Sequence, residues 1–242
     1  MNNIEARSEL VVKSNDLIRN TRYELNEVEQ KFIVYLISRI KKEDKELTEV
    51  NINLRDYCKT AGIKPTGGVI THMKDTIRNI SNKSWWLATG KNEETLFRWV
   101  DTATIKGETA KVKLSQSLIP FLLELKKDFT KYELMYVLCL RGKYAVRLYE
   151  ILKSYLFQGE WLIELSQLKQ IIRCEGYDAY KEFNRNVLKT SIQEINDYTD
   201  LAVSYETIKE GRSVKYINFK ISDMKTTDDY IESYQKRKKR MK

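Results

Sequence analysis

The chain has 242 residues, 42% of them hydrophobic, which is enough for one large domain or two of ordinary size. Its 43 lysines and arginines exceed its 34 acidic residues, and the net charge of +9 fits either plain solubility or a polyanionic partner, most often nucleic acid. The sequence has a single histidine, no signal-peptide pattern and no apolar run of about 18 residues, which predicts a cytoplasmic protein without a membrane span, zinc site or other cofactor.

The first half of the sequence predicts a helix, a short strand, two helices and a set of strands. Asn26 and Glu29 form the pattern of an N-cap with a capping box, and apolar residues then recur at helical spacing from residue 28 to 40. We expect Trp85, Trp86 and Trp99 to lie in the core of the sheet. The elements expected around them are an extended segment at 8–22, a strand at 50–54, helices at 55–61 and 69–81, strands at 85–89, 96–104 and 111–114, and a helix at 115–127.

The second half predicts a similar order of elements. Asp178 is the expected N-cap of a long helix over Ala179–Asp197. Two segments of alternating polarity then flank the turn Lys209–Arg212, which is typical of a β-hairpin. The elements expected in this half are helices at 132–140, 144–157 and 166–174, a strand at 161–165, the long helix, and hairpin strands at 201–208 and 213–221.

The two halves also resemble each other in sequence. Residues 52–63 read INLRDYCKTAGI and residues 163–174 read IELSQLKQIIRC, and downstream TIRNI at 76–80 is echoed by SIQEI at 191–195. A repeated unit of helix, strand, helix, helix and β-hairpin has the order of a winged helix-turn-helix. We therefore predict an α+β fold of two tandem winged-helix domains related by internal duplication, at residues 1–127 and 128–242.

The helix expected at 179–197 has the pattern of a DNA-reading helix. Its apolar residues gather on one side of a helical wheel. The other side matches base edges in the major groove, because Arg or Lys suits guanine and Asn or Gln suits adenine. Ordinary solvation is the competing interpretation, but a winged helix places its recognition helix here. The candidate base-reading residues are Lys181, Arg185, Asn186, Lys189 and Gln193, and the same face includes Glu182, Thr190 and Asn196.

Other basic residues are candidates for phosphate contacts. A wing with a basic tip usually rests on phosphates or enters a minor groove, although a charged turn exposed for solubility is the alternative. The equivalent helix of the first half has fewer base-reading amides and is better suited to phosphates. The run KRKKRMK at 236–242 is expected to be a mobile tail, which either adds non-specific phosphate affinity or has no role. The expected wing and phosphate contacts are Lys209, Arg212, Lys215, Lys64, Thr66, Lys74 and Arg78.

The sequence contains no enzyme motif. The stretch ATGKNEET at 88–95 lacks the first glycine and the final Ser/Thr of a P-loop, and no nucleophile elbow is present. The single histidine, His72, excludes the paired-histidine metal site that a rolling-circle nicking nuclease needs. The cysteines, Cys58, Cys139 and Cys174, fall inside apolar or helical patterns and are expected to be buried thiols. We therefore expect a binding protein without catalytic or metal-ligating residues.

Four segments of the chain resemble the iteron-binding replication initiators of plasmids, the Rep proteins with two winged-helix domains. No segment is diagnostic alone, but four in this order and at fitting spacing are specific, and they span nearly the whole chain. They are VVKSNDLI at 11–18 followed by LNEVEQKFIVYLISRI at 25–40, RGKYAVRLYEILKSY at 141–155, YKEFNRNVLKTSIQEIN at 180–196, and LAVSYETIKEGRSVKYINFKI at 201–221.

The resemblance implies that the second domain reads repeated origin sequences in double-stranded DNA, with Arg185, Asn186 and Lys189 facing bases. Asn186 stands where family members often have a basic residue. The first domain would contribute phosphate contacts and a dimer interface. The resemblance also implies a homodimer that represses its own gene, in equilibrium with a monomer that binds the repeats, opens the origin and recruits the host initiator protein and the replicative helicase. It assigns no role to residues 236–242.

Two other functions fit the same residues. A winged-helix transcriptional regulator would bind DNA without a replication role, so a DNA fragment carrying the gene and its flanking repeats would not replicate autonomously. A protein-interaction module with an incidental basic surface would show no steep salt dependence. Specific DNA binding, by contrast, weakens with salt at a log–log slope of about −0.9 for each phosphate contact.

Overall fold

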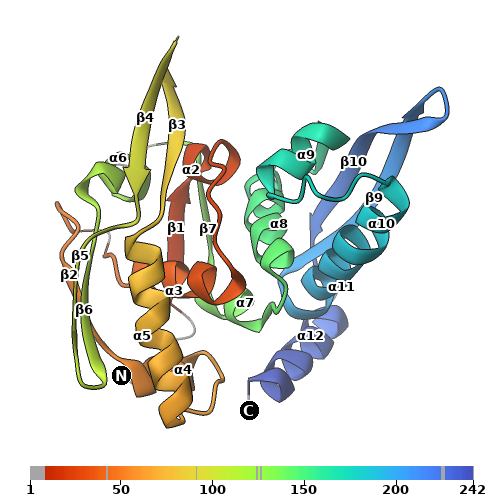
Figure 1. The fold of residues 1–242 in the computed structure, drawn as a ribbon. Coiled ribbons are helices and arrows are strands. Elements are labelled where there is room, and N and C mark those ends of the chain that lie inside the picture. The colour runs from red at the N-terminus through yellow and green to blue at the C-terminus, as the bar shows by residue number, and fades with distance from the viewer. Residues whose placement is uncertain are drawn as a thin grey trace. The chain divides into compact units, whose positions relative to one another are not determined.

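The structure, a computed structural model, describes residues 9–41, 43–90, 92–123, 125, 127–224 and 227–241, with side chains except at 88–90 and 227–231. The chain divides into two compact units (Figure 1), of which the first runs to Leu138 and also includes Met241, and the second covers Cys139–Arg240. None of the described helices combines the length and the apolar character that crossing a bilayer requires.

The first unit contains the predicted winged-helix order. The predicted capping box is confirmed, because Asn26 Oδ1 accepts from the Glu29 N–H at 3.0 Å while the Glu29 carboxylate accepts from the Asn26 N–H at 2.8 Å. Strands of the hairpin β5–β6 join β2 in a sheet of order β2-β6-β5. The elements are α3 (Glu27–Ile37), β2 (Glu49–Asn53), α4 (Leu54–Thr60), α5 (Gly67–Ser81), β5 (Val100–Lys106) and β6 (Thr109–Leu114).

A second strand pair extends the first unit beyond its predicted end. Strand β1 (Leu10–Ser14) pairs antiparallel with β7 (Phe129–Glu133), and α2 (Asn15–Arg19) follows β1 directly. The unit boundary therefore lies after Leu138 and differs from the predicted division between 127 and 128. The helix predicted at 132–140 begins only at α7 (Leu134–Cys139), because the residues before it form β7.

An additional hairpin, β3 (Ser84–Gly90) and β4 (Glu93–Arg98), stands between α5 and β5. The strand predicted at 96–104 is therefore two strands, which are separated at Trp99. Trp85 and Trp99 are buried, but Trp86 is 60% exposed, so its predicted place in the core is wrong. Successive residues of a strand face opposite sides, and burying Trp85 turns Trp86 outward.

The helix predicted at 115–127 is also much shorter than expected. It consists of a 3₁₀ turn (Gln116–Leu118) and α6 (Ile119–Leu122), and residues 124 and 126 lie outside the described residues. Pro120 stands in the first turn of α6, where its missing N–H costs no helical hydrogen bond.

The second unit has the same winged-helix order and a sheet of order β8-β10-β9, which corresponds to β2-β6-β5 of the first. A row of aromatic rings crosses this sheet: Tyr155 stacks on Trp161 (5.0 Å between ring centres), Trp161 on Phe219 (5.5 Å), and Tyr205 lies 6.0 Å from Phe219. The two predicted winged-helix domains are thus confirmed. The elements are α8 (Lys143–Ser154), β8 (Glu160–Glu164), α9 (Leu165–Ile171), α10 (Tyr180–Phe183), α11 (Lys189–Tyr198), β9 (Leu201–Glu210) and β10 (Ser213–Asp223).

The long helix predicted at 179–197 is interrupted by a π-helical turn. Residues Asn184–Leu188 form this turn between α10 and α11, and the Lys189 N–H donates to the carbonyl of Asn184, five residues earlier. The helix starts after Ala179, which makes no side-chain cap, so the prediction that Asp178 is the N-cap is wrong. We call α10, the π turn and α11 together the reading helix, after the DNA-reading role that the sequence predicts for it.

The basic C-terminal run is helical, which corrects the expectation of a mobile tail. Helix α12 (Thr227–Arg240) packs on α11, and Arg237 is only 1% exposed. The Ser233 hydroxyl donates to the carbonyls of Asp197 and Thr199 at the end of α11, at 3.1 and 3.3 Å. These contacts give the last carbonyls of the reading helix hydrogen-bond donors that they would otherwise lack. Lys242 lies outside the described residues.

Candidate nucleic-acid interface

The reading helix is held in the second unit by its apolar side. Phe183, Val187 and Leu188 are fully buried, and Ile192 and Ile195 continue the same side into α11. Burying large apolar side chains of this kind contributes about 1.5–3 kcal/mol each. The helix is therefore fixed in orientation, and its opposite side is free to contact a partner.

The exposed side of the reading helix carries all five candidate base-reading residues. The side chains are close neighbours: Arg185 Nε donates to Asn186 Oδ1 at 3.2 Å, and Gln193 Nε2 donates to Asp197 Oδ2 at 2.9 Å. These two contacts are exposed and weak enough to be exchanged for contacts with a ligand. Exposed on this side are Lys181, Glu182, Arg185, Asn186, Lys189, Thr190 and Gln193.

The π turn explains why Lys181 belongs to this surface. On an uninterrupted wheel, Lys181 falls at the edge of the polar face. One extra residue in a turn rotates the preceding segment by about 100° relative to the following one. Both α10 and α11 thereby place an apolar side in the core and a basic side outward. The Thr190 hydroxyl donates to the carbonyls of Asn186 and Val187 at 3.0 and 3.2 Å, which adds a partner to carbonyls in the turn.

Asn196, which the wheel also placed on the exposed side, faces the sheet instead. Its Nδ2 donates to the carbonyl of Val203 at 2.9 Å, and its Oδ1 accepts from the Val203 N–H at 2.7 Å. Strand β9 is an edge strand whose outer backbone groups have no neighbouring strand. The amide of Asn196 pairs with one residue of that edge, so this residue is structural.

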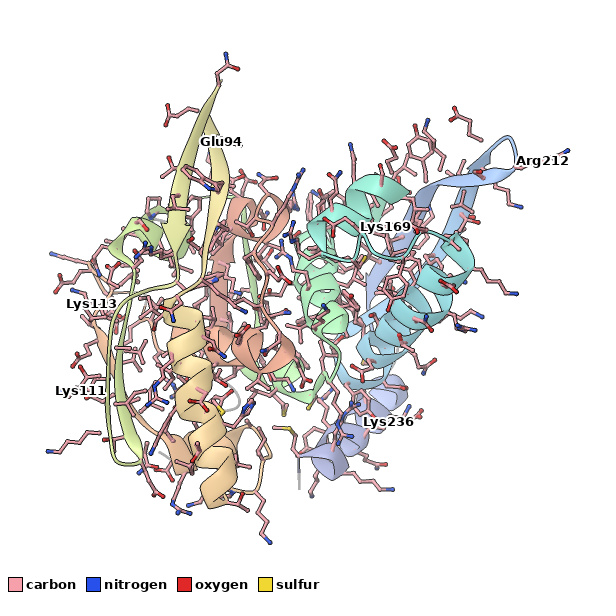
Figure 2. The ribbon with its side chains drawn as sticks, viewed as in Figure 1. Glu94, Lys111, Lys113, Lys169, Arg212 and Lys236 are labelled. Atoms are coloured by element: carbon pink, nitrogen blue, oxygen red, sulfur yellow. The ribbon has the colours of Figure 1, made fainter. Side chains whose placement is uncertain are left out.

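The hairpin β9–β10 forms a wing with two cations at its tip. Its turn contains Gly211 in the left-handed region (φ 62°), as a tight hairpin requires. Figure 2 shows Arg212 at the tip, pointing away from the sheet. Lys209 and Arg212 are exposed, and no ion pair joins either one to another described residue. Lys215 differs, because its Nζ donates to the Glu210 carboxylate at 2.7 Å, and this hydrogen bond raises the pKa of Lys215.

Three of the four candidate phosphate contacts of the first unit are half-buried or already have a protein partner. The Thr66 hydroxyl is the N-cap of α5 and accepts from the Val69 N–H at 3.4 Å. Arg78 forms an exposed ion pair with Asp75 at 2.7 Å, and Lys74 is half-buried. Lys64 is fully available on the loop before α5. An exposed ion pair is worth less than about 1 kcal/mol, so Arg78 can still exchange Asp75 for a phosphate.

Two acidic residues of the reading helix form ion pairs with α12. Lys236 lies 2.7 Å from Asp197, and Arg240 lies 3.0 Å from Glu194. Burial raises the pKa of Asp197, but hydrogen bonds from Gln193 and Lys236 outweigh it, so the pKa lies below its ordinary value. The basic C-terminal run thus offsets negative charge at the end of the helix that carries the basic face.

The cysteines are buried, as predicted, and burial raises the pKa of Cys174 to about 12. A thiol of such high pKa is almost wholly protonated at neutral pH and is a poor nucleophile. Within the part of the chain that the structure describes, no three His, Cys, Asp or Glu side chains are arranged to hold a metal ion.

Sequence reasoning missed the residues that support the exposed face. The hydroxyl of Tyr205 on β9 donates to Asn184 Oδ1 in the π turn, and Asn196 contacts the same strand. Leu201, Val203 and Tyr205 are every second residue of the strand and share one side of it, so the inward direction of Tyr205 could have been read from the strand pattern. A π turn has no comparable signal in a single sequence, and the partner of Tyr205 could not have been found.

The chain is similar to known proteins over nearly its whole length. A curated Escherichia coli relative, described as "Replication initiation protein", is 26% identical over 234 residues, covering 88% of this chain and 70% of that protein. The crystal structure of the Pi initiator protein in complex with iteron DNA has a TM-score of 0.73 at 17% identity, covering 91% of this chain and 99% of that one. Domains 2 and 3 of RctB match with a TM-score of 0.54 at 15% identity, covering 82% and 81%.

Two family matches account for most of the chain. Residues 10–153 match the family described as "Initiator Replication protein, WH1", and residues 160–221 match "Initiator Rep protein, WH2". The order of these matches is the order of the two winged-helix units, and α12 lies beyond the second match. The chain therefore belongs to the family of initiator replication (Rep) proteins with two winged-helix domains.

Proposed function

We propose that the chain is a plasmid replication initiator whose second unit binds directly repeated origin sequences (iterons) in double-stranded DNA. The observation that carries this proposal is the exposed basic side of the reading helix, beside a wing with two cations that lack ion-pair partners among the described residues. Family membership supports a role in initiation. The Pi protein, which shares the fold, is bound to iteron DNA in its crystal structure.

In this proposal the reading helix enters the major groove. Arg185 and Lys189 suit guanine, Asn186 and Gln193 suit adenine, and Lys181 completes the basic side at the start of the helix. Each good bidentate contact discriminates against a wrong base by about 1–3 kcal/mol. Arg185 stands in the π turn, at the middle of the exposed side, and is the first of these residues to test.

The remaining cations contact the sugar–phosphate backbone in the same proposal. Lys209 and Arg212 at the wing tip lose no protein partner when they bind phosphate, whereas Lys215 must leave Glu210. In the first unit, Lys64 and Lys74 contact phosphates, with Arg78 and the α5 N-terminus at Thr66 in support. Backbone contacts fix the position of the protein on the duplex but carry no sequence information.

We further propose the regulatory cycle that the family resemblance implies. A homodimer, formed through the first unit, represses the initiator's own gene. A monomer binds the repeats in the cytoplasm, opens the origin, and recruits the host initiator protein and the replicative helicase. Family membership supports these steps, and none of them requires a catalytic residue, metal or cofactor in this chain.

The test of DNA recognition is a footprint of the purified protein on the DNA that flanks its own gene, with binding measured by fluorescence anisotropy at several salt concentrations. Protection of several evenly spaced direct repeats, with a steep salt dependence, is the expected result. Protection of one inverted repeat alone would favour a transcriptional repressor instead. Binding without any sequence preference would refute the proposal.

Replacing Arg185 by alanine tests which helix reads the bases. We expect Arg185→Ala to cost about 1–3 kcal/mol on the specific site and to relax the base preference at one position of each repeat. Arg98→Ala is the matched control, because it removes the same exposed charge from β4 of the first unit. An equal loss on specific and random DNA for Arg185→Ala would contradict the base-reading role.

A further inference from the structure

The π turn of the reading helix is joined to the wing by one side-chain contact. The hydroxyl of Tyr205 donates to Asn184 Oδ1, and the two residues come from β9 and the π turn. Tyr205 is half-buried, and burial raises its pKa, so the hydroxyl stays protonated and remains a donor at neutral pH. Asn184 immediately precedes Arg185 and Asn186.

The ring of Tyr205 is itself fixed by the sheet. Tyr205 lies opposite Phe219 in the register of β9 and β10, and Phe219 is fully buried against the stacked ring of Trp161. A side chain that is already ordered by packing loses little entropy when it makes a hydrogen bond. Tyr205 is therefore a rigid support rather than a mobile surface group.

The π turn needs such a support. In the turn the Lys189 N–H donates to the carbonyl five residues earlier, that of Asn184, whereas an α-helix uses the carbonyl four residues earlier. Such π turns are rare and occur mostly as single turns at functional sites. If the turn relaxed to α-helical spacing, α10 would rotate by about 100° relative to α11. Lys181 would then turn toward the apolar side of the helix, and the side chains of Arg185 and Asn186 within the turn would shift relative to Lys189 while staying on the exposed side.

We propose that Tyr205 and Asn184 are specificity-determining positioning residues, which hold the π turn in the form that presents Arg185 and Asn186 to base edges. They contact no base themselves. This inference rests on the proposed function, because it requires that the reading helix reads DNA. It also means that the wing, through β9, sets the geometry of the helix as well as contacting phosphates.

The test compares specific and random DNA for Tyr205→Phe, which removes one hydroxyl and keeps the ring. We expect affinity for the specific repeat to fall roughly three- to ten-fold, the range that one neutral hydrogen bond spans. Affinity for random DNA and the salt slope should stay unchanged, because no phosphate contact is lost. Asn184→Ala should reproduce this loss, and the double variant should lose no more than either single variant.

Tyr149→Phe is the matched control. The Tyr149 hydroxyl donates to the carboxylate of Asp200 at 3.0 Å in the same unit, so its removal costs a hydrogen bond at least as strong without touching the π turn. If the role of Tyr205 were merely structural, Tyr205→Phe would behave as Tyr149→Phe does: each would lower the melting temperature and leave the ratio of specific to random binding intact. This result would overturn the proposal.

The Arg185→Ala variant distinguishes base reading by the reading helix from its positioning by Tyr205 and Asn184. If it relaxes base preference while Tyr205→Phe and Asn184→Ala do not, the positioning role is wrong and the proposed function stands. If Arg185→Ala changes specific and random binding equally, the reading helix does not read bases, and both proposals fall.

Discussion

Replacing Asn196 by alanine should destabilise the outer edge of β9 and leave the candidate DNA-contacting side chains unchanged. Asn196 makes two hydrogen bonds to a single residue of β9, accepting from the Val203 N–H at 2.7 Å and donating to its carbonyl at 2.9 Å. Val203 is 5% exposed, so water replaces the lost partner poorly. The side chain of alanine can make neither bond.

The size of the effect follows from these two bonds. A hydrogen bond of this kind contributes about 0.5–1.5 kcal/mol net, so the pair is worth about 1–3 kcal/mol to the local stability of the wing. Because the chain has two units, a single global unfolding free energy is not a suitable measure. Amide hydrogen exchange in the full chain reports the opening of individual residues instead.

The Val203 amide is the reporter, because its N–H donates to the side chain of Asn196. In Asn196→Ala we expect this amide to exchange about 5- to 150-fold faster, which corresponds to the loss of 1–3 kcal/mol. Gln193→Ala is the control, since it removes one exposed hydrogen bond from the same helix and should leave Val203 protected. Unchanged protection of Val203 in Asn196→Ala would show that the two bonds do not stabilise the edge of β9.

Three further predictions follow from the same contacts. Lys209→Ala with Arg212→Ala should weaken specific and random DNA alike and reduce the salt slope by about 1.8, as measured by anisotropy, if both bind phosphates. The pKa of Asp197 lies below its ordinary value, so the carboxylate contributes its full stabilisation above its unfolded pKa of about 3.9 and loses it as the pH falls through the folded pKa. In Lys236→Ala, NMR titration should show that the folded pKa of Asp197 is higher, because one of its hydrogen-bond donors is lost. Trp85→Ala should cost about 3–5 kcal/mol of first-unit stability while Trp86→Ala costs under about 1, as hydrogen exchange would report.

The elements that depend on local chemistry could be predicted from the sequence. Asn26 and Glu29 specify a capping box that needs only residues three positions apart, and the observed helix starts there. The β9–β10 hairpin likewise follows from alternation around Gly211, whose backbone conformation favours glycine. Periodicity also placed Arg185, Asn186, Lys189 and Gln193 on an exposed side, and the structure agrees.

The elements that depend on distant partners could not be predicted. Strand β7 exists because β1 pairs with it, and helical periodicity alone extended the next helix backward over its residues. The tail at 236–242 looked mobile because its composition is almost wholly basic. Its helix is stabilised by partners in α11, such as Asp197 and Glu194, which the composition of the tail does not reveal.

The two units differ in the element that follows their second helix and in the form of that helix. Both have a helix, a strand and a hairpin in the same order, but the first places the hairpin β3–β4 after its second helix, where the second unit goes directly into its wing. The helix α5 of the first unit is an uninterrupted α-helix whose cations are partly paired, as Arg78 is with Asp75. The reading helix of the second unit instead has a π turn, a connection to the wing through Tyr205, and exposed side chains that suit base edges. If the reading helix reads bases as proposed, substitutions in the π turn should therefore change sequence preference more than any equivalent change in α5.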